Sequence, residues 1–292
     1  MRKSIFDIAS ESVNMMNEAQ RLVAMAEKEN TLCVSSYEYC SLFEFIDSYC
    51  FRDWEWRGHF TDIKDFLKSI DYNSLKTRAT FRTDDFITLI ELIYNFWFLS
   101  QKAFLNEKRG YKLQWFGNYY HLKDVMDDIL DQYNQKAYFD NERVLIIEDK
   151  PEVTAVVEIV ETNLALDVIR YNHRSLQGEV ELKKQILISL GAELEPKRKE
   201  LQKINKQLSE DIFFMLNNIN IRHNNRSKKD KSKYKECVAK MSKKQLEKWY
   251  DELYQMMLLA ILLFDNTDRT VKVKELKDKI TGITTYENIE KF

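Results

Sequence analysis

The chain has 292 residues, 44% of them hydrophobic, and a formal net charge of −2. This length makes two domains the prior expectation, and the near-neutral charge excludes a global field that would attract nucleic acid, so any such attraction must be local. The chain has two prolines and six glycines, too few for sheets joined by tight turns. We therefore expect a folded protein of long helices with short connections.

The sequence gives no sign of secretion or of a membrane span. Asp7 and Glu11 interrupt any apolar run near the start of the chain, and the richest apolar stretch, residues 86–99, is too short to cross a bilayer. The four cysteines are spread along the chain without a CxxC pair: Cys33, Cys40, Cys50 and Cys237. We expect a soluble, cytoplasmic protein with reduced thiols and no membrane partner.

The N-terminal half alternates helical patterns with an aromatic-rich segment. Residues 4–29 carry apolar side chains near helical spacing, and residues 36–51 are dense in aromatic side chains. Another helix is expected over residues 62–70. The strongest pattern covers residues 83–105, which start at a threonine followed by two aspartates and are apolar nearly all round. A helix of this kind is buried, so we predict that it forms the centre of the N-terminal core.

A change of pattern in the middle of the chain marks the expected domain boundary. Residues 111–133 predict one more amphipathic helix. Residues 137–139 and 144–147, separated by a turn-prone Asp140 and Asn141, resemble a β-hairpin, which is the only convincing strand signal in the sequence. Two strands alone are marginal in water, so this hairpin must lie on helices. The predicted parts are an N-terminal helical domain over 1–135, a hairpin or linker over 136–150 and a C-terminal domain over 151–292.

The C-terminal half predicts a four-helix bundle. Its first helix starts at Pro151, a residue that suits the first turn of a helix, and its apolar residues recur at helical spacing as far as Tyr171. The second helix runs from about residue 178 to 190 and ends at Gly191, because glycine is the natural residue just past a helix C-terminus.

The third and fourth helices of this bundle flank a strongly polar loop. The third extends from about residue 195 to 217. The fourth begins at Ser242, which forms a capping-box pattern with Gln245, and continues to Phe264 before a short helix or charged tail. The predicted fold class is thus mostly α, with an N-terminal helical domain, a short hairpin near 137–147 and a C-terminal four-helix bundle.

The densest hydrogen-bonding chemistry lies where the third helix gives way to the loop. This polar cluster combines asparagines with one arginine and one histidine: Asn217, Asn218, Asn220, Arg222, His223, Asn224 and Asn225. Arg222 offers a planar fork of donors for a phosphate, and His223 can exchange a proton near neutral pH. The asparagines would orient a sugar or the imidazole ring. The alternative is a helix C-terminus whose free carbonyl groups are met by these side chains.

A basic loop follows the polar cluster directly. Its cationic residues are Arg226, Lys228, Lys229, Lys231, Lys233 and Lys235. Lysines that contact a phosphodiester backbone give affinity without sequence readout, mainly by releasing counterions. The alternative is an ordinary solvated loop.

A second histidine–arginine pair, His173 and Arg174, closes the first helix of the predicted bundle. In an antiparallel bundle the ends of the first and third helices lie at the same pole, so we expect His173 to approach His223. The alternative is capping of a helix C-terminus by cationic side chains.

The sequence predicts neither a metal site nor a cofactor site. The spacing of Cys33, Cys40, Cys50 and His59 differs from the short pairs that zinc sites use. Adjacent aspartates diverge on a helix, and no Walker-type glycine loop, GxSxG elbow or HExxH motif is present.

With these residues in place, residues 151–265 resemble the HEPN superfamily, including its abortive-infection and toxin members. Those domains are helical bundles with an arginine, a short interval and a histidine between the last two main helices. His223 matches the histidine. Asn217 and Asn218 stand at the arginine position and at the polar position after it, so the arginine is replaced here and Arg222 lies beside the histidine instead.

The resemblance implies a metal-independent ribonuclease that acts as a dimer on the 2′-hydroxyl and scissile phosphate of RNA. His223 would transfer the proton, Arg222 would hold the phosphate, and Asn218 and Asn224 would orient these groups. The substrate-binding set would comprise Asn217, Asn224, Asn225, Arg226, Lys228, Lys229, Lys231, His173 and Arg174. The expected protein is a bacterial antiphage-defence or toxin-type protein, a homodimer, with a phage or host protein as its trigger. The alternative is a non-catalytic helical module that uses the basic loop for dimerisation or partner binding.

Overall fold

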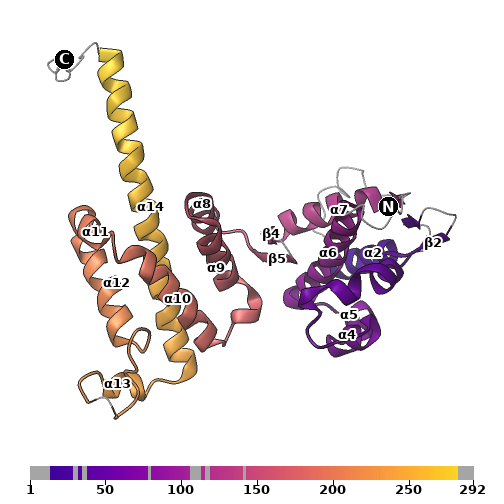
Figure 1. Cartoon of the computed structure of the whole chain (residues 1–292), viewed down its shortest axis with the longest axis horizontal. Helices are drawn as coiled ribbons and strands as arrows, with labels where there is room; N and C mark the ends of the chain where they lie inside the picture. Colours follow the sequence, from indigo (N-terminus) through magenta and orange to yellow (C-terminus); the bar gives the residue numbers. More distant parts are fainter. Residues whose placement is uncertain are drawn as a thin grey trace, which may run out of the picture. The chain divides into compact units, whose positions relative to one another are not determined.

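The computed structural model describes residues 14–28, 32–34, 38–77, 80–105, 113–115, 119–140, 143–229 and 231–281. The chain divides into two compact units, an N-terminal unit (1–149) and a C-terminal unit (150–292) (Figure 1). Most of the described residues are helical, which confirms the predicted fold class. The start of the first predicted helix (4–13), Asn141 of the predicted turn and the last residues of the tail (282–292) lie outside the described residues.

The N-terminal unit is built around the long buried helix that the sequence predicts. Its helices are α2 (Met15–Glu27), α3 (Leu42–Phe45), α4 (Ile63–Ser69), α5 (Tyr72–Thr77), α6 (Thr83–Leu105) and α7 (Tyr119–Gln132), with the single turns η1 (Ile46–Cys50), η2 (Phe51–Asp53) and η3 (Glu55–Arg57). Helix α6 has the predicted bounds, and Phe86, Ile90, Ile93 and Phe96 on it are fully buried. It packs against α2, α3, α5 and α7, so it is the centre of this core.

The N-terminal unit also contains two small antiparallel sheets. Strands β4 (Gln135–Asp140) and β5 (Arg143–Glu148) form the predicted hairpin. Strands β1 (Leu32–Val34), β2 (Glu38–Cys40) and β3 (Leu113–Trp115) form a second sheet in the order β2-β1-β3. The prediction of a single strand signal was therefore wrong, as was the helix predicted over 113–115. Three-residue strands are too short to show a period-two pattern, so the sequence could not reveal them.

The hairpin lies on α6 through polar side chains of that helix. Asn95 donates to the carbonyl of Val144 and accepts from its N–H, both at 2.9 Å, and Glu91 accepts from the N–H of Ile146 at 2.9 Å. A two-stranded sheet leaves backbone groups unpaired along its outer edges, and buried groups of this kind need partners. Asn95 and Glu91 supply them, which explains two polar residues in the apolar middle of α6.

The C-terminal unit is all helical in the part of it that the structure describes. It contains α8 (Pro151–Ile159), α9 (Thr162–Asn172), the turn η5 (Arg174–Leu176), α10 (Val180–Leu194), α11 (Arg198–Ile204), α12 (Lys206–Asn218), the short α13 (Glu236–Ala239) and the long α14 (Lys243–Thr281). Helix α14 packs against α8, α10, α11 and α12. Pro151 occupies the first turn of α8, and Ser242 and Gln245 exchange the two hydrogen bonds of a capping box before α14, as predicted.

Two of the four predicted bundle helices are broken in the structure. The first is interrupted at Val160 and Glu161, both extended, which separates α8 from α9. The third is interrupted at Asn205, whose side-chain oxygen accepts from the N–H of Leu208 at 3.0 Å and so starts α12. Apolar spacing continues across both breaks, so the periodic pattern predicted one continuous helix in each place where the structure has two.

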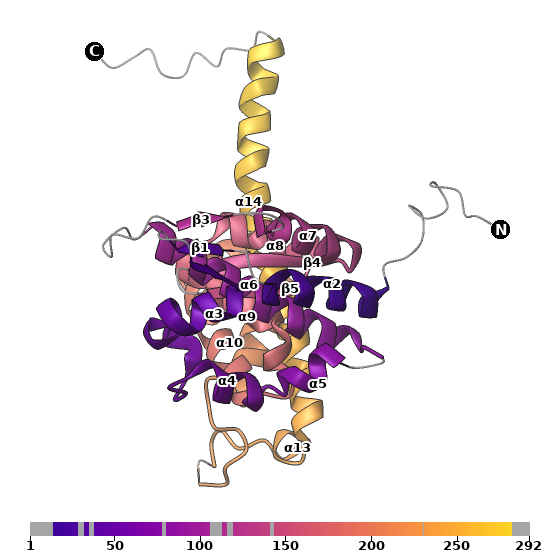
Figure 2. The same ribbon diagram turned by 90° about the vertical axis from the view of Figure 1, so that its right-hand side faces the viewer.

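The other two predicted helices end later than expected. Helix α10 passes through Gly191 to Leu194, so the prediction of a C-terminal glycine was wrong. A side chain at Gly191 would meet both methyl groups of Leu216 at 3.1 Å, so glycine serves the close approach of α10 and α12. Helix α14 continues to Thr281, well past Phe264. Figures 1 and 2 show that its second half extends beyond the other helices of the unit, at the end opposite the loop that holds α13.

Candidate functional site

The polar cluster begins with a turn that ends α12. The side-chain amide of Asn218 donates to the carbonyl of Phe214 at 2.8 Å. Asn220 is buried and adopts a left-handed backbone with φ of 67°. Asparagine is one of the few residues besides glycine that adopts this conformation readily. The chain then reverses, and the N–H of Arg222 donates to the carbonyl of Leu216 at 3.0 Å. Asparagine is thus used here to terminate a helix.

Asn225 holds the whole loop together. Its side chain is fully buried, and its oxygen accepts from the N–H of Asn220 at 2.8 Å. Its amide nitrogen donates to the carbonyls of Asn217 at 3.2 Å and Lys233 at 2.7 Å. Its own carbonyl accepts from the N–H of Lys235 at 2.8 Å. One residue therefore ties the end of α12 to both ends of the basic loop, because a buried amide of this kind must satisfy its donors and acceptor.

Arg222 turns back onto the helices instead of pointing into open solvent. Its Nη1 lies 2.5 Å from Oε2 of Glu195, and its Nη2 donates to the carbonyl of Gly191 at 3.2 Å. The guanidinium carbon also lies 5.6 Å from the ring centre of Phe213. These contacts join the end of α12 to the end of α10, so part of the predicted phosphate fork is already occupied by protein groups.

His223 and Asn224 differ from their neighbours in having no such contacts. The His223 ring is half-buried, and Asn224 is exposed. Among the residues that the structure describes, neither side chain forms a hydrogen bond or an ion pair. The backbone carbonyls of both residues accept bonds within the loop, from Asn225 and Ser227. Their side chains are therefore available to a ligand, although their backbone is fixed.

The basic loop presents its cations to solvent. Arg226, Lys228, Lys229, Lys231, Lys233 and Lys235 are all exposed. Arg226 donates to the carbonyl of Met241 at 3.1 Å, and Nζ of Lys228 lies 6.0 Å from the ring centre of Tyr234. Three more exposed lysines, Lys243, Lys244 and Lys248, follow on the first turns of α14 beside Trp249, which is 47% exposed. The exposure of Trp249 could not be predicted from the sequence, because exposure of an aromatic residue in an amphipathic helix depends on the packing.

The second histidine–arginine pair is built into a turn. His173 is buried at the end of α9, where its Nδ1 lies 2.7 Å from Oγ of Ser175 and accepts from the N–H of Ser175 at 3.3 Å. It therefore caps η5. Arg174, the first residue of η5, is half-buried. This capping differs from the predicted alternative, in which cationic side chains meet the C-terminus of a helix, because the His173 ring accepts a hydrogen bond at the N-terminus of η5.

The ends of α9 and α12 both contact the same stretch of α14. Asn172 donates to the hydroxyl of Tyr254 at 2.6 Å, and the hydroxyl of Tyr250 donates to the carbonyl of Asn220 at 3.3 Å. Burial raises the pKa of Tyr250 to about 12, so this hydroxyl keeps its proton. Tyr250 and Tyr254 lie one helical turn apart, so both helix ends meet the same side of α14.

A buried charge network lies beside these helix ends, and the sequence did not reveal it. Nζ of Lys183 lies 2.8 Å from Oε1 of Glu247 and 2.8 Å from Oδ1 of Asp251. The hydroxyl of Tyr171 donates to Asp251 at 3.0 Å, and burial is the main cause that raises the pKa of Tyr171. Burial acts to raise the pKa of Glu247, but hydrogen bonds from Lys183 and from the N–H of Gly178 lower it overall. Lys183 is therefore a structural cation that joins α10 to α14.

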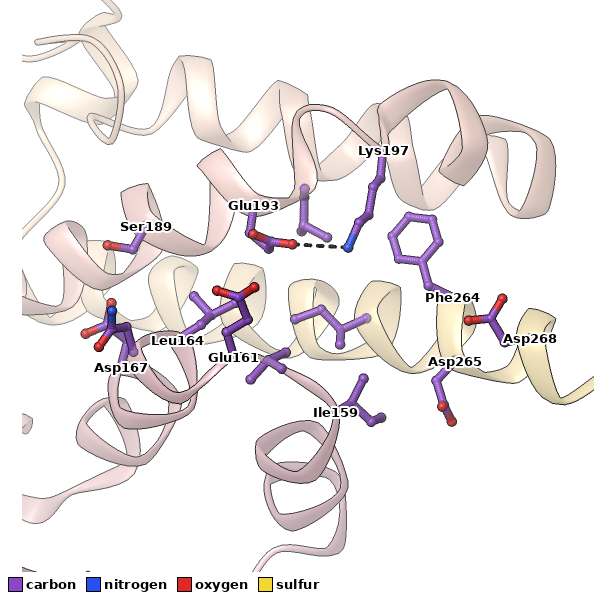
Figure 3. A pocket seen from close by; sticks show the side chains of 14 residues that line it. Ile159, Glu161, Leu164, Asp167, Ser189, Glu193, Lys197, Phe264, Asp265 and Asp268 are labelled. Atoms are coloured by element: carbon purple, nitrogen blue, oxygen red, sulfur yellow. Dashed lines mark hydrogen bonds and ion pairs between the residues drawn. The ribbon is translucent and has the colours of Figure 1, made fainter. Parts of the chain in front are cut away.

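A pocket of about 500 Å³ lies in the C-terminal unit between the α8–α9 break, α10 and α14. Figure 3 shows its lining, with apolar side chains that include Leu164 and Phe264 and carboxylates from each of the surrounding helices. The acidic residues of this lining are Glu161, Asp167, Glu193, Asp265 and Asp268. None of them was selected from the sequence, where they are separated by up to about a hundred positions and form no motif.

Comparisons with known proteins leave the chain without an assigned family: no protein-family model matches it, and neither a curated protein nor a solved structure is significantly similar. Among the described helices, none is long and apolar enough to cross a membrane. The described residues also contain no group of three or more His, Cys, Asp or Glu side chains placed to hold a metal ion. Of the four cysteines, Cys237 is an exposed free thiol.

Proposed function

We propose that the C-terminal unit is a HEPN-like bundle that binds RNA through the basic loop, in a cytoplasmic, homodimeric antiphage-defence or toxin-type protein that a phage or host protein triggers. One observation supports the proposal of RNA binding: the side chain of Asn225 fixes the basic loop, while the lysines of this loop remain exposed. A loop that is already ordered loses less conformational entropy on binding, so more of the electrostatic attraction contributes to affinity.

The catalytic part of this proposal rests on His223. Its ring is half-buried and unpartnered among the described residues, so it is available for proton transfer at the 2′-hydroxyl of RNA. Arg222 donates to Glu195 and Gly191, so it can hold a phosphate only with its remaining donors or after leaving Glu195. Cleavage therefore requires His223 and an Arg222 that can reach a phosphate, whereas binding requires only the exposed lysines. Binding and cleavage are tested by separate experiments.

RNA binding is tested by replacing Lys228, Lys229 and Lys231 with alanine. We expect the affinity for single-stranded RNA to fall at least tenfold and the slope of log K against log salt to decrease by about 2, because each lysine releases a fraction of a counterion. The matched control replaces three exposed lysines of α14, Lys272, Lys274 and Lys277, which changes the net charge equally. An equal loss in both variants would show a general charge effect and would contradict binding at the loop.

Cleavage is tested by incubating the wild-type protein and His223→Ala with mixed RNA in EDTA. We expect cleavage by the wild-type protein and loss of at least a hundredfold in rate in the variant, the usual contribution of a general acid or base. An unfolding midpoint of His223→Ala that matches the wild-type value controls for disturbance of the loop. If the wild-type protein binds RNA but does not cleave it, the non-catalytic interaction module is the correct alternative.

A further inference from the structure

The acidic pocket has the size and lining of a small-molecule site. Its volume of about 500 Å³ falls within the range of roughly 300–1,000 Å³ typical of ligand pockets. Leu164 of α9, Leu194 of α10 and Ile261 and Phe264 of α14 give it an apolar floor. Carboxylates surround this floor, and Figure 3 shows those of Glu161 and Glu193 facing the same space. A ligand that fits must therefore combine apolar segments with positive charge.

The positive charge that the pocket already holds does not balance its carboxylates. Nζ of Lys197, which lines the pocket, lies 3.1 Å from Oε1 of Glu193, and Arg269, which lies outside the lining, has its Nε 2.5 Å from Oδ2 of Asp265. The other three carboxylates of the lining, those of Glu161, Asp167 and Asp268, form no ion pair or hydrogen bond with any residue that the structure describes. Glu161 precedes α9 but does not use its side chain to cap that helix. Three negative charges thus remain uncompensated around one cavity.

One contact inside the pocket shows which chemical group fits it. The ammonium group of Lys197 lies between the carboxylate of Glu193 and the ring of Phe264, at 5.8 Å from the ring centre. A primary ammonium at the face of an aromatic ring and next to a carboxylate is stabilised by both groups. The pocket therefore already contains one amine on an alkyl chain, in a position that a ligand amine can imitate.

We propose that this pocket binds a linear aliphatic polyamine. Ammonium groups would pair with Glu161, Asp167 and Asp268, and the methylene segments between them would cover Leu164 and Ile261. A bare divalent metal ion fits less well, because the described residues contain no group of three side chains placed to coordinate it. The apolar floor also offers no oxygen ligands to such an ion. This inference goes beyond RNA binding and does not depend on it.

The test is calorimetric titration of the full-length protein with spermidine, in the absence of RNA, against a variant with the pocket charges reduced. The pocket variant is Glu161→Gln with Asp167→Asn, and the control is Glu200→Gln with Glu252→Gln, two exposed carboxylates of the same unit outside the pocket. We expect saturable one-site binding to the wild-type protein, at least tenfold weaker binding to the pocket variant and unchanged binding to the control. No saturable binding, or an equal loss in both variants, overturns the proposal.

Competition separates a polyamine site from other cation sites. At constant ionic strength, 1-aminobutane, which has one ammonium group, should displace spermidine far less well than 1,4-diaminobutane. Magnesium that displaces spermidine as effectively as the diamine would show an unspecific acidic surface and would overturn the proposal. A lysine-rich peptide that binds the pocket more tightly than spermidine would equally overturn it, in favour of a protein partner. The substituted carboxylates have no partners to lose, so unfolding midpoints should match within experimental error.

Discussion

The basic loop and the acidic pocket of the C-terminal unit are charged in opposite senses, and they also differ in how their polar residues are used. In the loop, the residues that stand out in the sequence are mostly engaged with the protein itself: Asn225 binds three backbone groups and Arg222 binds Glu195. In the pocket, Glu161 at the start of α9, Asp167 on α9 and Asp268 on α14 have no partner among the described residues. Asn225 and Arg222 thus serve the structure of the protein itself, whereas these three carboxylates remain available to a ligand.

Among the substitutions that test this difference, Asn225→Ala should have the largest effect on the free energy of unfolding. The substitution leaves the N–H of Asn220 and the carbonyls of Asn217 and Lys233 without the amide that pairs with them. At about 1 kcal/mol for each hydrogen bond, the C-terminal unit should lose about 3 kcal/mol of unfolding free energy. Urea unfolding followed by circular dichroism measures this loss.

Asn224→Ala is the matched control for that substitution. It removes the same side chain from the adjacent position, where the amide is exposed and forms no hydrogen bond that the structure records. We expect its unfolding free energy to stay within about 0.5 kcal/mol of the wild-type value. Equal losses in the two variants would show that the loop is not held through Asn225, and the contrast between loop and pocket would disappear.

The difference between contacts within a short segment and contacts between distant segments also explains which parts of the structure the sequence could predict. Strong periodic and capping signals predicted α6, the hairpin and the start of α14 correctly, because each depends on residues close together in the chain. The breaks at Glu161 and Asn205 were not predicted, since apolar spacing runs through them. The cluster at Asn217–Asn225 was found where α12 ends, but which amide is buried depends on the fold of the loop. The pocket and the Lys183 network join distant elements and leave no local pattern.

The next largest effect on the free energy of unfolding is expected at Lys183, a buried cation that pairs with two carboxylates. Its side chain is 7% exposed, and Lys183→Met removes the charge that pairs with Glu247 and Asp251. Loss of one partner from a fully buried pair costs roughly 3–5 kcal/mol, but Asp251 is 49% exposed, so we expect about 2 kcal/mol here. Lys184→Met, whose amine lies 3.9 Å from exposed Glu181, should change the unfolding free energy by less than about 0.5 kcal/mol.

The stability of the C-terminal unit should depend on pH through Glu247, the carboxylate that pairs with Lys183. The pKa of Glu247 lies below its ordinary value in the folded protein, because the hydrogen bonds from Lys183 and Gly178 outweigh the effect of burial. Its contribution is present above the unfolded pKa and is lost as the pH falls through the lower folded pKa. Glu247→Gln should therefore reduce the fall in unfolding midpoint between about pH 6 and about pH 3. A fall in the variant that equals or exceeds the fall in the wild-type protein would contradict this assignment.

The smallest effect is expected at Glu195, where the loop and α10 meet. Its side chain is 45% exposed and pairs with an Arg222 that is 25% exposed, so Glu195→Gln should lower the unfolding free energy by less than about 1 kcal/mol. The same change frees part of the guanidinium fork, so RNA affinity should rise by about two- to threefold if Arg222 can reach a phosphate. Glu193→Gln breaks the pair with Lys197 in the pocket, with the same change of net charge, and separates this effect from a general gain of positive charge. A rise in RNA affinity that is equal in both variants would mean that Arg222 serves only to hold α12 against α10.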